Sequence, residues 1–312
     1  MASSFQTWFK VAFQVRGSIL TSILPQALLF GGFGVLISGL YQQGIALALP
    51  RTLPMFVVEG ILGGLLLIWL HFTSRQCIQG QQQWQMLMNT TRNLSRQMWL
   101  AIEEKEVKDR TQKVKAMMLL VAFAVALKLH LRGEPIHSDR NTPNNLQDLL
   151  SGQQYKSLTQ LPTPPLEIAF WLGDYLQMQY ERERLNLAQL TTMQAQLSNM
   201  IDILGHCEQL VTGVMPKQYS TYLRQLLLIY CTLLPFQLVD ALGWGTGPVV
   251  ILIAITLLGT EALGHTIDIF NPSPSALPLD TICTALHREV TELTTRPPHP
   301  KTSIKTSLFH PE

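Results

Sequence analysis

Long uncharged, apolar stretches alternate with polar stretches along this chain. No Asp, Glu, Lys or Arg occurs between Arg16 and Arg51, and Asp240 is the only such residue between Gln225 and Thr260. A helix needs about 20 mostly apolar residues to cross a bilayer. The pattern therefore predicts four membrane-crossing helices, at about 23–48, 54–72, 219–239 and 248–263.

The last two stretches are the shortest and admit another interpretation. They are joined at 240–247 and, taken alone, could form a buried helical hairpin in a water-soluble protein. The presence of four apolar stretches in one chain favours the membrane interpretation. The first stretch is also rich in glycine, and small residues allow helices to approach closely within a membrane. These glycines are Gly31, Gly32, Gly34 and Gly39.

The region between the second and third apolar stretches, 75–218, predicts further helices. Residues 86–110 carry charges of both signs, which is typical of an exposed or inter-subunit helix. Residues 113–131 are apolar almost all round and could pass for a fifth span. Their apolar core of about 13 residues is short for a bilayer, however. We therefore expect a buried helix outside the membrane.

The rest of this region and the tail are more polar. Residues 133–165 contain several prolines and predict a loop, or a short helix within a loop. Residues 166–208 predict a long helix that is broken only at Gly173 and Asp174. The tail after Thr294 has too little apolar surface to fold alone.

Composition supports a chain divided between membrane and water. Charged residues make up 14% of the sequence, against about 25% in ordinary soluble domains, and 47% of the residues are hydrophobic. The net charge is only +2, and the aromatic residues do not interleave with basic ones, so no nucleic-acid partner is expected. The amphipathic segment 1–15 predicts a helix that lies in the membrane interface.

Lysine and arginine near the ends of the predicted spans indicate the orientation in the membrane. Only Arg51 lies between the first and second spans. The basic residues on the other side are Lys10, Arg16, Arg75, Arg92, Arg96, Lys217 and Arg224. Both termini and the middle region are therefore expected in the cytoplasm. The host is expected to be the cell (inner) membrane, with a thylakoid-type membrane as the alternative.

Together these patterns predict an all-α membrane protein with four transmembrane helices and a cytoplasmic helical region. Five consecutive parts are expected. They are the interfacial helix with the first two spans (1–74), the cytoplasmic helices (75–218), the third and fourth spans (219–265), a cytoplasmic C-terminal segment (266–293) and a disordered tail (294–312).

The sequence contains no set of residues that predicts catalysis, a cofactor or a metal site. The eight histidines show no HxxxH or HExxH spacing, and nucleotide-binding and nucleophile-elbow motifs are absent. We therefore do not expect an enzyme. One ionisable residue, Glu59, falls within a predicted span, where a charge is costly and a candidate functional group. Alternatively, Glu59 faces water near the outer mouth, since Arg51 is close in sequence.

Several short strings stand out for their order and spacing. They are RGSIL at 16–20, TRNLSR at 91–96, LKLHLRGE at 127–134, CE at 207–208, PFQLVD at 235–240 and LPLDTIC at 277–283. Together they resemble the bestrophin family, particularly its bacterial and plant members. The resemblance covers about 5–293, and the combination is specific although each string alone is weak.

This resemblance implies a homopentamer that conducts chloride and similar monovalent anions passively. In the family the second span lines a central pore, and its narrowest part, the neck, is ringed by three apolar residues one helical turn apart. A second constriction, the aperture, lies deeper in the cytoplasmic part. Dry apolar rings can gate by dewetting, and they favour weakly hydrated anions.

The three neck positions of the family can be aligned with this sequence in two registers. Counting back from Trp84 gives Gly60, Gly64 and Ile68, and a shift by one residue gives Ile61, Leu65 and Trp69. Each set recurs every four residues and so follows one helix face. The first set implies an unusually wide neck, and the second keeps it apolar. The glycines have a further explanation without any pore, which is packing against the glycine-rich first span.

Two other family sites depart from the pattern of their relatives. Counting back from Cys207 places the aperture near Thr191, where relatives carry an aliphatic residue. Animal members hold calcium with an acidic cluster just after the Leu-Pro-Leu-Asp string, and 281–288 contains no acidic residue. We therefore expect no calcium site.

The function predicted from the resemblance is a passive chloride channel subunit whose second transmembrane helix lines the pore. Its expected partners are monovalent anions, the lipid bilayer and further copies of the same chain. The alternative is a non-conducting membrane scaffold or regulator with the same fold. This alternative is motivated by the altered neck and by the 71–83 string, which replaces the family's basic and acidic residues after the neck. A secondary transporter is less favoured, because no inverted repeat is evident.

Overall fold

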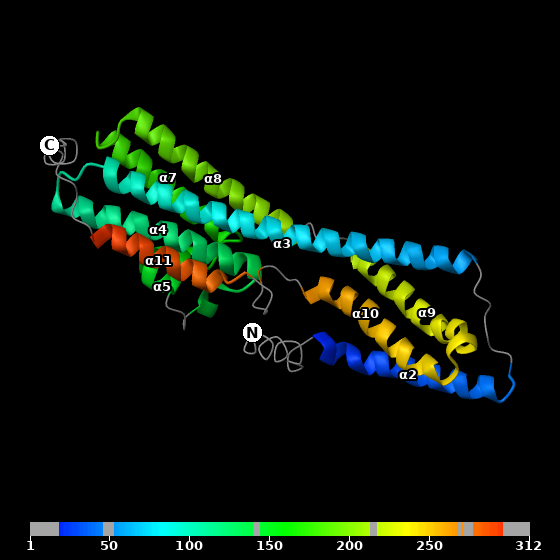
Figure 1. Cartoon of the computed structure of the whole chain (residues 1–312). Coiled ribbons are helices and arrows are strands. Elements are labelled where there is room, and N and C mark those ends of the chain that lie inside the picture. The colour runs from blue at the N-terminus through cyan, green and yellow to red at the C-terminus, as the bar shows by residue number, and fades with distance from the viewer. Residues whose placement is uncertain are drawn as a thin grey trace, which may run out of the picture. The chain divides into compact units, whose positions relative to one another are not determined.

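The computed structural model describes residues 19–45, 53–139, 144–212, 217–266, 270 and 277–295. Every regular element in these ranges is a helix (Figure 1), so the predicted all-α class is confirmed for this part of the chain. The predicted interfacial helix at 1–15, Arg51 and nearly all of the tail lie outside the described residues. The elements are α2 (Ile19–Gln42), α3 (Leu53–Ala101), α4 (Val107–Arg132), η1 (Ile136–Asp139), α5 (Leu146–Leu149), α6 (Gly152–Leu158), α7 (Pro164–Glu181), α8 (Leu187–Thr212), α9 (Lys217–Leu242), η2 (Gly243–Gly245), α10 (Thr246–Thr266) and α11 (Leu279–Thr295).

The chain forms two compact units. The first unit comprises Met1–Cys77 and Val214–Asp268, and the second comprises Ile78–Gly213 and Ile269–Glu312. Helix α3 contributes its N-terminal half to the first unit and the remainder to the second. The predicted boundaries after 74, 218 and 265 lie within a few residues of the boundaries between these units, and the predicted boundary after 293 has no counterpart. The assignment of the five parts to membrane or cytoplasm stays a prediction.

The core of the first unit is built by α2, α3, α9 and α10. Each helix contributes a stripe of apolar residues three or four positions apart, as expected for helices that pack along one face. The buried members are Ile23 and Ala27 of α2, Leu62, Leu66 and Trp69 of α3, Leu223, Leu227 and Cys231 of α9, and Ala254 and Leu258 of α10.

Helices α2 and α10 approach each other at glycines. A Cβ atom on Gly34 would lie 3.3 Å from the Cα atom of Gly247, and a Cβ atom on Gly31 would collide with the side chain of Ile251. Larger residues would push the two helices apart, which is the role of small residues in membrane helix packing. The close packing predicted from the glycines of the first span is thus present at Gly31 and Gly34, with α10 as the partner.

Within the part of the chain that the structure describes, four stretches are long and apolar enough to cross a membrane. In the α4 stretch 78% of the most apolar window is buried, against 22 to 33% in the other three. An apolar helix that is covered by protein has little surface left for lipid, which agrees with the prediction of a buried helix at 113–131. The four stretches are Ser22–Gln42, Glu59–Ala101, Lys108–Arg132 and Tyr219–Ala262, the last of which includes both α9 and α10.

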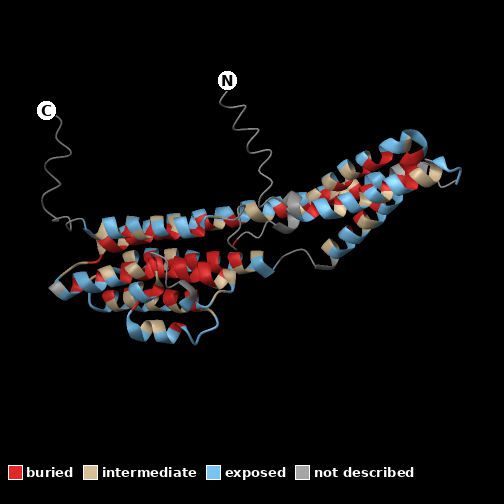
Figure 2. Ribbon diagram, turned by 90° about the horizontal axis from the view of Figure 1, so that it is seen from below, coloured by how far each residue is buried: buried red, intermediate tan, exposed pale blue. Residues whose placement is uncertain are grey.

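Helix α4 is the centre of the second unit. It contacts α5, α7, α8 and α11, and every residue from Leu119 to Leu129 is buried, as the red segment in Figure 2 shows. The helix ends at Gly133, whose φ of 65° lies in the left-handed region that glycine adopts without strain. The backbone N–H of Gly133 donates to carbonyl oxygens of the last turn.

The predicted helix at 86–110 is wrong at its C-terminal end. Helix α3 ends at Ala101 and α4 begins at Val107. The turn between them is held by the buried Lys113, whose Nζ donates to the carbonyl oxygen of Ile102 at 2.8 Å and to Glu104 Oε1 at 3.0 Å. The Asp109 carboxylate also accepts hydrogen bonds from the backbone N–H groups of Lys105 and Glu106, so both a cap and the Lys113 contacts stabilise this turn.

The predicted helix break at Gly173 is also wrong. Helix α7 continues through Gly173, and the break lies between Glu181 and Leu187, where Glu183 has a φ of 57°. A Cβ atom on Gly173 would lie 3.4 Å from Leu197 Cδ2. This glycine therefore allows α7 and α8 to pack closely and does not end a helix.

Candidate functional site

In the first unit, one face of α3 is packed against the other helices. Leu62, Leu66 and Trp69 lie in the common core, and Trp69 is 5% exposed. The Trp69 ring stacks on Tyr219 of α9, with ring centroids 6.0 Å apart. The Tyr219 hydroxyl donates to the carbonyl oxygen of Leu65 at 3.2 Å. These contacts fix the rotation of α3 about its own axis within this unit.

The opposite face of α3 is exposed and has no neighbour among the described residues. Ile68 is 55% exposed, and Gly60 and His71 are exposed as well. A Cβ atom on Gly60 or Gly64 would meet no atom within 4 Å. Gly60 and Gly64 therefore do not serve close packing against the described residues, unlike Gly31 of α2. We call the surface formed by Gly60, Gly64, Leu67, Ile68 and His71 the open face of α3.

The two predicted neck registers lie differently on this helix. In the first set, Gly60 and Ile68 are exposed and Gly64 is half-buried, so all three belong to the open face. The second set is divided between the two faces. Ile61 is exposed, Leu65 is half-buried against the core, and Trp69 is buried within it.

Glu59 lies one residue before the open face and is exposed. Its Oε1 accepts a hydrogen bond of 3.3 Å from the hydroxyl of Tyr230 on α9. Among the described residues Glu59 forms no ion pair. Beyond it, the sequence carries no Asp or Glu from Gly60 to Ala101, while His71, Arg75, Arg92 and Arg96 occur in the same stretch.

Thr191 lies in the second unit, on the exposed face of α8. The buried face of this helix is formed by Leu190, Met193, Leu197 and further apolar residues. The Thr191 hydroxyl donates to the carbonyl oxygen of Leu187 at 2.9 Å. Its methyl group and the oxygen lone pairs remain for other contacts.

The second unit also contains ion pairs that the sequence did not suggest. Lys128 Nζ lies 2.9 Å from Asp280 Oδ1, and Arg132 Nη2 lies 3.0 Å from Asp280 Oδ2. Burial opposes ionisation of Asp280, but the hydrogen bonds from Lys128 and Arg132 outweigh it and hold the pKa of this carboxyl below its usual range. Lys128, Arg132 and Asp280 all belong to strings noted in the sequence, LKLHLRGE and LPLDTIC. Their pairing joins α4 to α11, which no local pattern could show.

Two further contacts hold the same unit together. Arg92 of α3 makes a two-pronged ion pair with Glu289 of α11, at 2.7 and 2.8 Å. The hydrogen bond from Arg92 lowers the pKa of Glu289. His130 Nε2 lies 2.7 Å from Glu208 Oε1 and so connects α4 with α8. Charge-assisted contacts of this kind connect helices that are distant in sequence.

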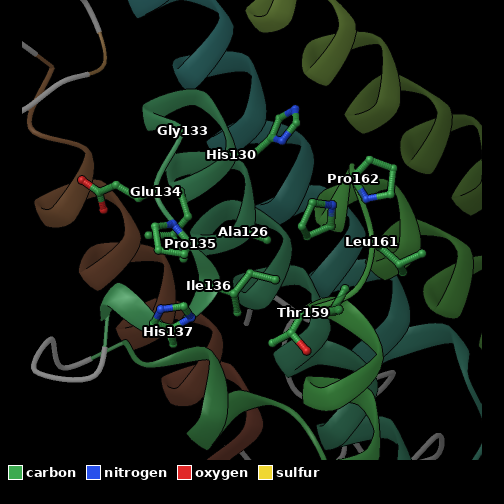
Figure 3. Close-up of a pocket in the computed structure, with 13 residues that line it drawn as sticks. Ala126, His130, Gly133, Glu134, Pro135, Ile136, His137, Thr159, Leu161 and Pro162 are labelled. Atoms are coloured by element: carbon green, nitrogen blue, oxygen red, sulfur yellow. The ribbon is translucent and has the colours of Figure 1, made fainter.

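A small pocket of about 230 Å³ adjoins the end of α4 (Figure 3). His130, Gly133, Glu134 and His137 contribute to its lining, together with several prolines and leucines. Figure 3 shows the His130 and Glu134 side chains extending in opposite directions. The residues drawn there do not converge on one point as a catalytic set would. Within the described residues, no group of three His, Cys, Asp or Glu side chains is arranged to hold a metal ion.

Comparison with known proteins gives consistent matches over nearly the whole chain. Residues 1–292 match the family described as Bacterial/Fungal Bestrophin protein. A voltage-dependent anion channel-forming protein of Nostoc sp. is 46% identical over 298 residues, which are 94% of this chain and 93% of that protein. A protein of Synechocystis sp. with the same description is 36% identical over 295 residues, or 93% of each chain.

The fold also matches a solved structure. A bacterial bestrophin homolog from Klebsiella pneumoniae with a tryptophan-to-alanine mutation has a TM-score of 0.80 and 25% sequence identity. The match covers 90% of this chain and 99% of that chain. From the family match and the 46% identical relative, we conclude that this chain belongs to the bestrophin family.

Proposed function

We propose that this integral membrane protein is a subunit of a passive anion channel, with several copies arranged around a central pore lined by the open face of α3. The proposal is supported by relatives from Nostoc sp. and Synechocystis sp. that are described as anion channel-forming. The observation that carries it is the open face itself. This face has no packing partner among the described residues, and no carboxylate follows Glu59 on α3 to repel a passing anion.

Of the two registers, we propose Gly60, Gly64 and Ile68 as the neck. Trp69 could face a pore only by leaving its stack on Tyr219, which would expose a large buried side chain. In the chosen register the two glycines make a wide entrance, and Ile68 forms the narrowest apolar ring. An apolar ring excludes water, so anions that lose their hydration shell easily pass it best.

Thr191 is the proposed second constriction. Because its hydroxyl hydrogen is engaged by Leu187, the residue offers its methyl group and oxygen lone pairs to the pore. An aperture of this kind would be small and weakly polar. Calcium is not expected to activate the channel, since both carboxylate oxygens of Asp280 are already engaged by Lys128 and Arg132.

The assembly we propose is a homopentamer in the cell membrane, with both termini and the second unit in the cytoplasm. A thylakoid-type membrane is the alternative. Chloride is the expected main permeant ion, and the activity is ion conduction rather than catalysis.

The proposal is tested by anion flux into liposomes that contain the purified chain. Ile68→Ala should change the ratio of iodide to chloride flux, because it widens the narrowest ring. Leu252→Ala is the matched control, since Leu252 is an exposed aliphatic residue of α10 in the same unit. Equal flux ratios in both variants would contradict the proposed neck. Absence of any flux from intact oligomers would instead favour a non-conducting scaffold.

A further inference from the structure

His71 lies on the open face of α3, just after the proposed neck. It follows Ile68 by three residues, Gly64 by seven and Gly60 by eleven, which keeps all four on one side of the helix. At a rise of about 1.5 Å per residue, its Cα lies about 4.5 Å beyond that of Ile68 along the axis. His71 is exposed, and so is Arg75 in the next turn.

The imidazole of His71 is uncommitted within the described residues. His71 takes part in a hydrogen bond through its backbone, where its carbonyl oxygen accepts from the Ser74 hydroxyl at 3.0 Å. The nearest carboxylate on the same helix is Glu59, about 18 Å away along the axis, and it is held by Tyr230. No acidic residue follows on α3. A proton on His71 would therefore not be neutralised by an ion pair from its own helix.

Among the described residues of the first unit, titratable side chains also occur on α2, α9 and α10, the helices that share the core with α3. On α9, Tyr219 stacks on Trp69, and Arg224 is exposed. On α10, Glu261 is buried. On α2, the Tyr41 hydroxyl donates to Asp240 at 2.8 Å. Within the described residues of the first unit, the charge that the open face presents after the neck therefore comes from His71 and Arg75.

Histidine is the side chain that ordinarily changes charge between pH 5 and 8, and its protonated ring offers two N–H donors. Arginine stays charged throughout this range. We propose that His71, with Arg75, forms an anion-binding station at the inner end of the neck, and that protonation of His71 increases anion current. This inference rests on the proposed channel function, and it identifies the residue that couples conduction to pH.

The test is single-channel conductance of the purified full chain in planar bilayers with symmetric chloride, measured at pH 8 and at pH 5.5. The conductance should rise at least about threefold on acidification, which is the effect of a single protonated copy of His71 about 6 Å from an anion in water-like surroundings. His71→Gln should stay near the pH 8 level at both pH values. His71→Arg should stay at the higher level at both. His137→Gln, an exposed histidine of the second unit, should keep the rise.

Size-exclusion chromatography in detergent confirms that each variant assembles like the parent, and His71→Arg provides the test if His71→Gln does not assemble. A pH response that persists in His71→Gln or in His71→Arg would overturn the inference. A chloride current that does not change with pH in the parent would overturn it as well, while leaving the proposed function intact. If the parent protein carries no anion current at either pH, both the inference about His71 and the proposed channel function are contradicted.

Discussion

Trp69 of α3 and Tyr219 of α9 stack with their ring centroids 6.0 Å apart and their planes inclined by 25°. The Tyr219 hydroxyl reaches back to the carbonyl oxygen of Leu65, one turn earlier on α3. Two contacts at successive turns fix how α3 is rotated in the first unit. Trp69 is turned inward, so Ile68 and His71 are turned outward. The choice between two neck registers that differ by one residue depends on this pair.

Trp69→Ala should strongly destabilise the first unit. It removes a large buried side chain and leaves a cavity among four helices, a change that costs about 3–5 kcal/mol in protein cores. Ile68→Ala, on the open face, should cost about 0.5 kcal/mol or less. Thermal unfolding of both variants in the same detergent gives the comparison. Similar losses of stability in the two variants would mean that Trp69 and Ile68 are not on opposite faces of α3, in contradiction to the structure.

Gly133→Ala should destabilise the second unit, although there is space for the added methyl group. A Cβ atom at this position meets no atom within 4 Å, but the φ of 65° is unfavourable for alanine. The expected loss is about 1 kcal/mol. Gly205→Ala is the matched control, because Gly205 also has open space but lies within α8. There alanine should stabilise the helix by about 0.5–1 kcal/mol. A loss of equal size in both variants would show that the backbone conformation at Gly133 is not the cause.

The ion pairs of Asp280 predict how stability depends on pH. The pKa of Asp280 is lowered in the folded chain, so its contribution to stability is complete above the ordinary pKa of an aspartate and is lost as the pH falls through the lowered value. Asp280→Asn should therefore lower the melting temperature at pH 7. Below about pH 4 the melting temperatures of the variant and the parent should converge. Glu292→Gln is the control, because Glu292 pairs with Arg288 at 3.7 Å on the surface. If the difference in melting temperature between Asp280→Asn and the parent stayed constant with pH, the ion pairs of Asp280 would not be its source.

Thr191→Val tests the proposed aperture with little change in volume. It removes the hydroxyl from the exposed face of α8 and should shift the permeability ratio toward weakly hydrated anions. Thr192→Val is closely matched, because Thr192 is also exposed and its hydroxyl donates to Ala188 at 2.8 Å. Since Thr192 lies about 100° further round the helix, its substitution should leave selectivity unchanged. Equal shifts in bi-ionic reversal potentials would argue against a specific role of Thr191.

The apolar pattern of the sequence predicted the helical class, the apolar stretches and the buried character of α4. These features depend on residues that are close in sequence, so local patterns are sufficient. The predicted helix at 86–110 and the predicted break at Gly173 were wrong because the apolar pattern alone shows neither the contacts between helices nor the caps at their ends. Lys113 holds the turn after α3, and Gly173 serves the close approach of α8.

The candidate site was less predictable. Counting from Trp84 left two neck registers, and only the stack between Trp69 and Tyr219 distinguishes the faces of α3. The ion pairs of Asp280 could not be predicted, because Lys128 and Arg132 are about 150 positions away in sequence. His71 was visible in the sequence, but its exposure beside the proposed neck requires the structure.

The channel proposal is tested most directly by the reversal potential of currents through the purified chain in planar bilayers with asymmetric chloride. The proposal predicts a reversal close to the chloride equilibrium potential. Bilayers that stay silent although size measurements show intact oligomers would contradict it. A reversal close to the cation equilibrium potential would contradict it as well.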